Sequence, residues 1–486
     1  MQIDQRGAKS ETSGTIDNLL IDDIISRDVA LHRRNMFTFW IDVKKAFDSV
    51  SHSWLLEMLK LHRVPTKLID IIRNIISKWN LVLLIPIKVG LQESNSIQLT
   101  NGELQGDTLC PSLYTLCSNP VSWMLRSTEG CTLSSPIKEK ITHTFFIDDL
   151  KGYTKSIEKG IKVLNKLKQC MEDSGLLWNE KKCKVSFSHR GKLVDNGHLH
   201  LRDGMRISYL KKDETYKFMG VYQTNKNAVD QLQVSLLDKV KKRSHIIWTS
   251  QLSDYNKIIA TNIFVNSSTE YYFWACKFQI TFLREMDASI RKSMNISGAK
   301  HTNLINAALY LPRAKGGRGL RCIEQTYKEA KIKIAMKITN TKDQRVQLVK
   351  TFHNENRESN SYSIYKEAVK YANEFDINLE VTDNTVKIDF PDGSQIDSEN
   401  ENSDTILGKK LIIARNEKYL GEILRSPWQG VTLKSRNDDQ NITSGYFDWL
   451  SKWNACPTGV ISELFSLFYQ TLPTKCFQIT MSIILL

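Results

Sequence analysis

Residues 142–152 read Thr-His-Thr-Phe-Phe-Ile-Asp-Asp-Leu-Lys-Gly, in which an apolar run meets two adjacent acids without a spacer. The apolar residues 145–147 favour a β-strand, and the residues after Asp148 and Asp149 read as a turn and a return strand. The stretch therefore predicts a tight hairpin that holds two carboxylates at its tip. Adjacent carboxylates repel each other, and burying one without compensation is costly, so a divalent cation would stabilise this tip.

The Asp-Asp pair is a weak signal by itself, because the chain holds two more Asp-Asp pairs, at residues 22–23 and 438–439. Most such pairs are solvated caps or turns. A third acid upstream strengthens the interpretation, because Asp42 ends the apolar, strand-like residues 37–41. The position of Asp42 also permits an alternative, in which it caps the helix-like segment that follows.

Two strands that each deliver a carboxylate at one end can lie side by side and share two divalent ions. A pair of ions activates an attacking hydroxyl and stabilises the leaving group of an in-line displacement. Ligand sets made only of oxygen favour Mg²⁺ or Mn²⁺ over softer metals. The three acids together therefore predict a two-metal site.

Segments that occur in a fixed order along the chain resemble motifs A to E of reverse transcriptases, in the variants of non-long-terminal-repeat (LINE-type) retrotransposons. Asp-Val-Lys-Lys-Ala-Phe-Asp-Ser-Val, from Asp42, resembles motif A, and Phe-Ile-Asp-Asp-Leu-Lys, from Phe146, resembles motif C. The other three are Gly-Glu-Leu-Gln-Gly-Asp-Thr-Leu-Cys-Pro-Ser at 102–112 for motif B, Asn-Glu-Lys-Lys-Cys at 179–183 for motif D and Tyr-Lys-Phe-Met-Gly at 216–220 for motif E. Further on, residues 309–320 resemble a segment found after the thumb of metazoan elements.

The resemblance implies an α+β fold, in which a right-hand polymerase palm with an antiparallel sheet is joined to partial fingers, a helical thumb and a C-terminal helical extension. The expected divisions are partial fingers at 1–36, the palm with fingers elements and motifs A to E at 37–225, the thumb and connection at 226–345, an acidic linker at 346–405 and a truncated C-terminal helical region at 406–486.

The resemblance also implies a function, RNA-directed DNA polymerisation, with an RNA template, a DNA primer, deoxynucleoside triphosphates and Mg²⁺ or Mn²⁺. Paired acids at this spacing alone would also admit an RNA-dependent RNA polymerase or an intron maturase. Phe146 ahead of the acids and the Lys-Ala-Phe-Asp stretch favour the retrotransposon interpretation.

The resemblance assigns metal binding to Asp42, Asp148 and the Val43 carbonyl, while Asp149 completes or supports the site. Lys182 is expected to donate a proton to the departing pyrophosphate. A lysine in a Lys-Lys pair is more often simply an exposed residue.

Substrate contacts follow in the same way. Phe47 would block a ribose 2′-hydroxyl, although its spacing fits a core phenylalanine equally well. The remaining assignments are the nucleotide-binding residues Gln105 and Gly106 and the primer-grip residues Phe218, Met219 and Gly220.

Some features depart from the family pattern. The earlier strands of the fingers have no counterpart here, and neither a zinc-knuckle nor a restriction-like endonuclease signature is visible. The family usually carries a basic residue shortly before its Gln-Gly pair, where Thr100, Asn101 and Glu103 stand. Arg6 and Lys9 are candidates for holding a triphosphate, but a mobile N-terminal loop is the stronger interpretation. These departures motivate a second hypothesis, a truncated remnant that binds nucleic acid without polymerising.

The charge distribution fits a nucleic-acid partner. The net charge is +14, and residues 231–345 hold 20 Lys and Arg against 8 Asp and Glu, which is an excess of 12 positive charges. A basic segment of this length suits a polyanion. Residues 371–405 instead hold 10 acids and one base, which predicts turns and a flexible linker.

Composition also constrains the compartment. The nine cysteines show no Cys-x-x-Cys pair, so we expect neither a zinc knuckle nor a disulfide framework. The first 30 residues lack the pattern of a signal peptide, and the apolar residues 479–486 are too few to span a bilayer. We therefore expect an intracellular protein, nuclear or cytoplasmic, without membrane contact.

Overall fold

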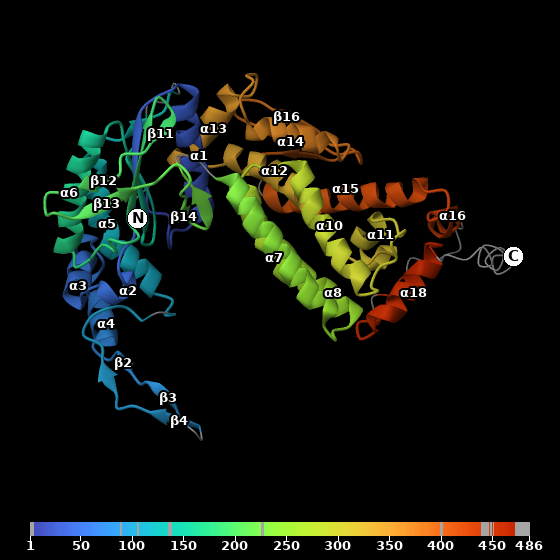
Figure 1. The fold of residues 1–486 in the computed structure, drawn as a ribbon, viewed down its shortest axis with the longest axis horizontal. Helices are drawn as coiled ribbons and strands as arrows, with labels where there is room; N and C mark the ends of the chain where they lie inside the picture. The colour runs from blue at the N-terminus through green and yellow to red at the C-terminus, as the bar shows by residue number, and fades with distance from the viewer. Residues whose placement is uncertain are drawn as a thin grey trace. The chain divides into compact units, whose positions relative to one another are not determined.

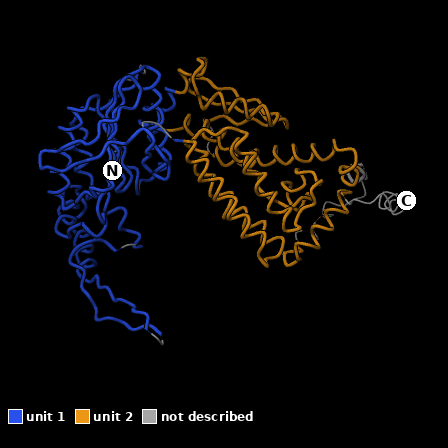
Figure 2. The backbone as a smooth tube through the Cα atoms, in the orientation of Figure 1, with its two compact units in different colours: residues 1–228, 342–352 blue, residues 229–341, 353–486 orange. Residues whose placement is uncertain are grey.

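The computed structural model of the chain describes residues 4–87, 90–104, 106–134, 139–224, 228–398, 402–438, 447, 450 and 452–471 (Figure 1). These residues form two compact units (Figure 2). Unit 1 comprises Met1–Ala228 and Lys342–Phe352, and unit 2 comprises Val229–Thr341 and His353–Leu486. The division after Ala228 lies close to the 225/226 boundary that the motifs predict between palm and thumb.

The centre of unit 1 is a seven-stranded sheet with the order β12-β13-β10-β1-β9-β8, and β11 pairs with β10. All neighbours run antiparallel except β10 and β13. The α+β expectation for the fold is therefore confirmed. The strands are β1 (Met36–Ile41), β8 (His143–Phe146), β9 (Asp149–Thr154), β10 (Lys184–His189), β11 (Lys192–Val194), β12 (His198–His200) and β13 (Arg206–Tyr209).

Strand β1 is buried along its whole length because its alternate side chains face two covered sides of the sheet. Phe37, Phe39 and Ile41 belong to the main apolar core, whereas Trp40 donates a hydrogen bond to Gln223 on the opposite face. A strand of this kind needs large apolar residues on both faces, which is what the sequence Met-Phe-Thr-Phe-Trp-Ile supplies.

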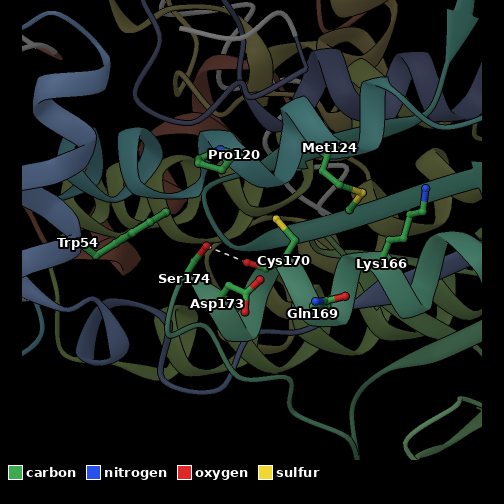
Figure 3. A pocket seen from close by; sticks show the side chains of 8 residues that line it. All are labelled: Trp54, Pro120, Met124, Lys166, Gln169, Cys170, Asp173 and Ser174. Atoms are coloured by element: carbon green, nitrogen blue, oxygen red, sulfur yellow. Dashed lines mark hydrogen bonds between the residues drawn. The ribbon is translucent and has the colours of Figure 1, made fainter.

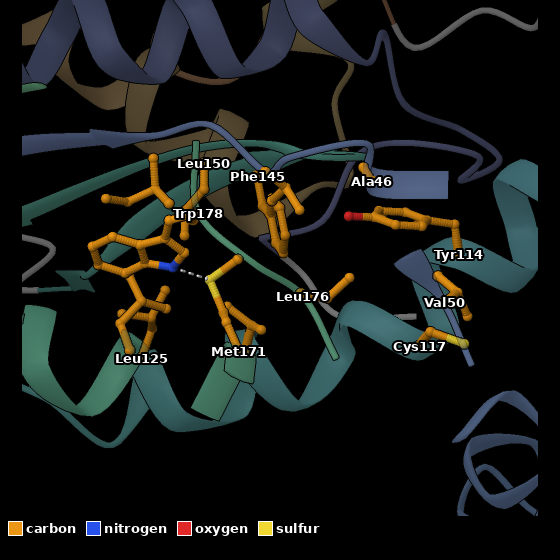
Figure 4. Close-up of a cluster of buried hydrophobic side chains, with 14 of the residues drawn as sticks. Ala46, Val50, Tyr114, Cys117, Leu125, Phe145, Leu150, Met171, Leu176 and Trp178 are labelled. Atoms are coloured by element: carbon orange, nitrogen blue, oxygen red, sulfur yellow. Dashed lines mark hydrogen bonds between the residues drawn. The ribbon is translucent and has the colours of Figure 1, made fainter. Parts of the chain in front are cut away.

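Helix α6 covers the core side of the sheet. Ser156 caps its N-terminus by accepting a hydrogen bond from the Lys159 amide. Its buried residues recur at helical spacing, and its Met171 sulfur accepts a hydrogen bond of 3.1 Å from the Trp178 indole (Figure 4). The helices of unit 1 are α1 (Thr15–Leu31), α2 (Ala46–Ser49), α3 (His52–Leu61), α4 (Thr66–Ile76), α5 (Cys110–Arg126), α6 (Ile157–Asp173) and most of α13 (Gln344–Glu355).

Short hairpins complete unit 1. Strand β2 pairs with β5, β3 with β4, β6 with β7 and β14 with β15, each as a separate two-stranded sheet. Their bounds are β2 (Asn80–Leu81), β3 (Leu84–Ile87), β4 (Gly90–Glu93), β5 (Ile97–Gln98), β6 (Cys131–Thr132), β7 (Lys140–Ile141), β14 (Tyr216–Phe218) and β15 (Val221–Gln223).

A surface cavity of about 300 Å³ opens between α3, α5 and α6 (Figure 3). Trp54 contributes from α3 and Cys170 from α6, and the Ser174 hydroxyl donates a hydrogen bond of 2.8 Å to the Cys170 carbonyl. None of the three acids that the sequence predicts as metal ligands lines this cavity.

Unit 2 is mostly helical. Asp254 is fully buried at the start of α8, where it forms ion pairs with Arg313 and Arg318. Its helices are α7 (Val229–Thr249), α8 (Asp254–Ala260), a π-helical turn (Thr261–Asn266), α9 (Ser267–Ala275), α10 (Ile280–Ile296), α11 (Ala307–Tyr310), a 3₁₀ turn (Arg313–Lys315), α12 (Ile323–Thr339), α14 (Ile364–Asn373), α15 (Ser403–Arg425), α16 (Val431–Asp438) and α18 (Thr458–Phe468).

The prediction of a flexible acidic linker at 346–405 is wrong for the described part of that range. It contains α14 and an antiparallel sheet of β16 (Asn378–Val381), β17 (Val386–Asp389) and β18 (Gln395–Asp397). The physical reason is a period-2 pattern, since apolar residues of all three strands are buried while the acids between them are mostly exposed. Among the described residues, none of the helices combines the length and the apolar character that crossing a bilayer requires.

The close packing of β9 on β1 is testable at Gly152. A Cβ atom there would lie 2.0 Å from the ring of Phe39, which is fully buried. We expect Gly152→Ala to lower the free energy of unfolding by roughly 1–3 kcal/mol or more, because the ring has no room to move. Urea unfolding measures this.

The matched control is Gly459→Ala in α18, where a Cβ atom would meet nothing within 4 Å. Alanine favours a helix interior by up to about 1 kcal/mol over glycine, so this change should be neutral or stabilising. Equal unfolding midpoints for Gly152→Ala and the parent chain would contradict the packing described here.

Candidate active site

The predicted acidic hairpin is formed by β8 and β9. Phe146 pairs with Asp149, so Ile147 and Asp148 make a two-residue turn. Ile147 has a φ of 56°. Positive φ at the first turn position is the geometry of a type II′ turn, which usually requires glycine there, and a β-branched residue pays about 1–3 kcal/mol for it. The tip is therefore a strained turn that its surroundings must hold.

Gln5 holds this turn. Its Oε1 accepts hydrogen bonds of 2.9 Å from the Ile147 and Gly7 amides, and its Nε2 donates one of 3.3 Å to the Ile147 carbonyl. The Gln5 side chain is fully buried, and its backbone pairs with Phe145 in a parallel bridge. Gly7 allows the close approach, because a Cβ there would lie 2.5 Å from the Ile147 side chain.

The sequence did not reveal the role of Gln5, because a polar residue in an aperiodic segment carries no pattern. The neighbouring Arg6 also differs from its suggested role as a triphosphate ligand. Its guanidinium is buried and forms ion pairs with Asp17 at 3.2 Å and Asp343 at 2.8 Å. Lys9 is half-buried, and the segment that holds both residues is fixed by these contacts.

The sheet brings Asp42 to the same place as the hairpin tip. Ile41 pairs with Leu150 in the antiparallel register of β1 and β9. Asp42 follows Ile41 and Asp149 precedes Leu150, so this register directs both acids to the same end of the strand pair. The backbone pairing thus delivers carboxylates from distant parts of the chain to one point.

The charges of neighbouring acids act on the pKa values of Asp148 and Asp149. Burial raises the pKa of Asp148, and the charge of Asp42 raises it further. Burial raises the pKa of Asp149 to about 6, with additional repulsion from Asp148 and Asp42. The charge of Lys182 lowers the pKa of both Asp148 and Asp149, and the Lys182 Nζ lies 3.6 Å from an Asp42 oxygen. The structure therefore gathers Asp42, Asp148, Asp149 and Lys182.

Lys182 reaches this site through a turn anchored next to Val43. The Lys44 amide donates to Leu177 and the Asn179 amide donates to Asp42, each at 2.8 Å. Neither of these bonds uses the Val43 carbonyl. The turn then continues to Lys182, whose amide donates to the Asn179 carbonyl at 2.9 Å.

The donor atoms at the tip are hard oxygens with uncompensated negative charge, which fits Mg²⁺ or Mn²⁺ chemically. Within the described ranges, however, no three His, Cys, Asp or Glu side chains form a group that could hold a metal ion. The charge of Asp42 acts on both Asp148 and Asp149, but among the described residues the three carboxylates do not form a finished ligand set.

Phe47 lies on α2 and is held from two sides. Its ring packs against Tyr114 with centroids 4.9 Å apart, and its carbonyl accepts a hydrogen bond of 3.0 Å from the Glu103 amide. Gly102 packs against the backbone of Asp48, where a Cβ would lie 3.0 Å from the Asp48 Cα. The segment that resembles motif B is thus fastened to the helix that carries Phe47.

The other predicted substrate residues occupy turns. Gly106 has a φ of 99°, a conformation that side chains rarely adopt, whereas Gln105 lies outside the described residues. Met219 and Gly220 both have positive φ and connect β14 to β15 as a type I′ turn. Phe218 and Met219 are buried, with exposed fractions of 1% and 7%.

Glu103 and Tyr216 also lie near these groups; Tyr216 begins the segment that resembles motif E, whereas no role was predicted for Glu103. Glu103 is 4% exposed, and among the described residues neither carboxylate oxygen has a hydrogen-bond partner. Burial, with a contribution from the Asp107 charge, raises its pKa to about 8. Tyr216 stacks on Trp40 at 5.4 Å, and burial with the charges of Asp42 and Asp149 raises its pKa, so it also lies near the acids.

Comparison with known proteins finds a match for the part of the chain that carries this sheet and acidic hairpin. Residues 6–223 match the family described as reverse transcriptase (RNA-dependent DNA polymerase). Similar curated proteins are Pol polyproteins of R2 retrotransposable elements, so the chain resembles the reverse transcriptase region of non-LTR elements.

The sequence similarity to these relatives is distant. Identity is 23% over 314 residues with the type-2 element R2DM of Drosophila melanogaster, which covers 64% of this chain and 29% of the relative. It is 25% over 217 residues with the R2 polyprotein of Nasonia vitripennis, covering 43% and 20%, and 26% over 216 residues with that of Popillia japonica, covering 43% and 34%. The matched region thus spans about a third or less of each relative's length.

Solved structures with some similarity include two telomerases in complex with a TWJ fragment of telomeric RNA. The one from Candida tropicalis has a TM-score of 0.34 and 13% identity, covering 72% of this chain and 53% of the other. The one from Candida albicans has a TM-score of 0.26 and 10% identity, covering 71% and 53%.

The raised pKa of Glu103 predicts a pH-dependent stability. Unfolded glutamate loses its proton near pH 4.5, whereas folded Glu103 keeps it to about pH 8. Between these values the folded state binds more protons, so this residue makes stability fall with rising pH by at most ~1.4 kcal/mol per pH unit. Glu103→Gln should remove that slope, and urea unfolding at several pH values between 5 and 9 measures it.

The control is Glu57→Gln on the exposed face of α3, which should leave the slope unchanged. The advantage of Glu103→Gln over the parent chain should grow from pH 5 to pH 8 and then level off. A constant difference across this range would show that the Glu103 carboxyl ionises normally in the folded chain.

Proposed function

We propose that this chain is an RNA-directed DNA polymerase that adds deoxynucleotides to a primer 3′-end on an RNA template. The observation that carries this proposal is the meeting of Asp42 with Asp148 and Asp149 at the end of two paired strands. The match of residues 6–223 to the reverse transcriptase family supports nucleotidyl transfer as the reaction of these acids.

In this proposal Asp42, Asp148 and the Val43 carbonyl hold Mg²⁺ or Mn²⁺, and Asp149 completes or supports the site. Two bound divalent ions supply activation of the 3′-hydroxyl and stabilisation of the pyrophosphate. The raised pKa values of Asp148 and Asp149 support the assignment, because a carboxylate cluster of this kind gains most from an added cation. Lys182 stands beside Asp42, in position to deliver a proton to the departing pyrophosphate.

Phe47, Gln105 and Gly106 select and align the nucleotide in this proposal. Phe47 is suited to exclude a 2′-hydroxyl, because its ring and its backbone are both fixed and cannot easily yield to a larger sugar. The open φ of Gly106 lets backbone approach a ligand closely.

The primer grip is assigned to Phe218, Met219 and Gly220, and the thumb to residues 226–345. The two buried side chains of the grip leave its turn backbone as the surface that a primer contacts. On α7 the residues Lys241, Lys242 and Arg243 are exposed, and they are suited to neutralise phosphates of the template–primer duplex. The partners are thus RNA, DNA and deoxynucleoside triphosphates.

Asp148→Asn tests the proposed chemistry. On an RNA template with a DNA primer and Mg²⁺, the parent chain should incorporate deoxynucleotides, and Asp148→Asn should reduce the rate by roughly 100-fold or more because it removes a ligand charge. Asp213→Asn, at an exposed acid of the same unit, is the control and should remain active. Salt-sensitive binding by the parent chain without any incorporation would instead support the nucleic-acid-binding remnant.

Phe47→Ala tests the sugar selection. We expect the ratio of kcat/KM for deoxynucleotides to that for ribonucleotides to fall by roughly 10-fold or more, because the ring that blocks the 2′-hydroxyl is gone. Phe187→Ala, at another half-buried phenylalanine of the sheet, should weaken stability and leave this ratio unchanged. If Phe47→Ala leaves the ratio of kcat/KM for deoxynucleotides to that for ribonucleotides unchanged, Phe47 is a core side chain without a role in sugar selection.

A further inference from the structure

The hairpin β14–β15 that carries the primer-grip residues is not part of the large sheet. Its two strands pair only with each other among the described strands. Since no ladder of backbone hydrogen bonds joins it to β1 or β9, side chains must fix its position. One of these is Tyr216, which stacks on Trp40 of β1.

The other attachment is a buried polar network of Asp22, Lys151, Tyr153 and Gln223. Gln223 Nε2 donates to Asp22 Oδ2 at 2.7 Å, and Gln223 Oε1 accepts from Lys151 Nζ at 2.8 Å. Lys151 Nζ also lies 2.6 Å from Asp22 Oδ1, which accepts a further hydrogen bond of 2.8 Å from the Tyr153 hydroxyl. All four residues are at most 2% exposed.

The network joins three elements that the proposed reaction needs in register. Asp22 lies on α1, Lys151 on β9 and Gln223 at the end of β15. Lys151 follows Asp149 by two residues, so the two side chains share a face of β9. Its Nζ also lies 4.8 Å from the Trp40 ring and 5.7 Å from the Phe218 ring.

A merely stabilising role explains this arrangement poorly. A buried ion pair adds little stability over apolar residues of the same volume, but a fully satisfied buried network restricts its members to one geometry. Gln223 is the only member from the hairpin, and it satisfies both a carboxylate and an ammonium group. An apolar side chain there would pack, yet it would define no fixed offset between β15 and β9.

We propose that Gln223 is a positioning residue that locks the primer-grip hairpin at a fixed offset from the strand carrying Asp149, and thereby aligns the primer 3′-end with the carboxylates. The inference deepens the proposed function and rests on it. Asp22 and Lys151 are the counterparts of this lock, and they couple the offset to α1 as well.

The first measurement is hydrogen exchange of the backbone amides, which needs no activity. Gln223→Leu removes the hairpin from the network and leaves the Asp22–Lys151 ion pair in place. We expect the amides of β14 and β15 to exchange roughly 10-fold faster, with the amides of β1 unchanged, because local opening no longer breaks the buried hydrogen bonds of Gln223 to Asp22, Lys151 and Trp40.

The matched control is Tyr153→Phe. It removes one hydrogen bond of similar length from Asp22 but none from Gln223. The hairpin should keep its protection in this variant. Equal loosening in Tyr153→Phe and Gln223→Leu would overturn the proposal, since the network would then act only through general stability.

The second measurement is primer extension with a KM and kcat split. Gln223→Leu should lower kcat by roughly 10-fold or more, because misplacing a reacting group by about 1 Å is costly. The KM for the template–primer duplex should change by less than about threefold, because phosphate contacts elsewhere supply that affinity.

An exchange of groups guards against a folding defect. Gln223→Glu alone puts two carboxylates on Lys151 and should lower kcat. Asp22→Asn combined with Gln223→Glu restores one carboxylate and one amide, and kcat should recover in this double variant. Equal kcat in the parent chain and Gln223→Leu overturns the positioning role alone. No incorporation by the parent chain overturns the proposed function, and unchanged exchange in the hairpin overturns the lock independently of activity.

Discussion

The antiparallel pairing of β1 with β9 is the interaction on which the rest of the site depends. Its register sets Ile41 against Leu150, so a slip of one residue would turn Asp42 to the other face of the sheet. The buried aromatic rings Phe37 and Phe39 fix the register, since each contributes about 1.5–3 kcal/mol by leaving water. This burial opposes the cost of keeping Asp149 at the strand end, where burial and the charges of Asp148 and Asp42 raise its pKa to about 6.

The strained tip of the hairpin is braced from two distant parts of the chain. Gln5 fixes the Ile147 peptide, and the segment around it is fixed in turn by Arg345, which pairs with Asp4 at 3.0 Å. Together with the pair of Arg6 and Asp343, this explains why residues 342–352 belong to unit 1. A turn with a β-branched residue at positive φ persists only where its surroundings determine it from several sides.

Sequence patterns predicted the elements that are defined by the local order of residues. The apolar strands that end in acids were visible because a run of strand-forming apolar residues and the acid after it are local properties, and the α+β fold follows from them with the motif resemblance. Gln5 and the Gln223 network were not visible, because the hydrogen-bond partners that define them lie 72 to 201 residues away. Glu103 was not visible because no local pattern shows that this acid is buried. The prediction of an acidic linker was wrong although the relevant pattern was local. Counting charges concealed the buried alternation of residues such as Ile388.

Strand β9 carries both a carboxylate of the candidate site, Asp149, and a buried structural ammonium group, Lys151, and the two have different partners. Asp149 and Lys151 share a face two residues apart, a spacing at which they could neutralise each other. Instead Asp22 engages Lys151 at 2.6 Å, and Lys182, not Lys151, lowers the pKa of Asp149. The buried ammonium is thus satisfied inside the protein, and the negative charge at the tip stays available to a cation from solution. Removing Asp22 would free Lys151 to compete for that charge, which is why a residue on α1 bears on the chemistry of β9.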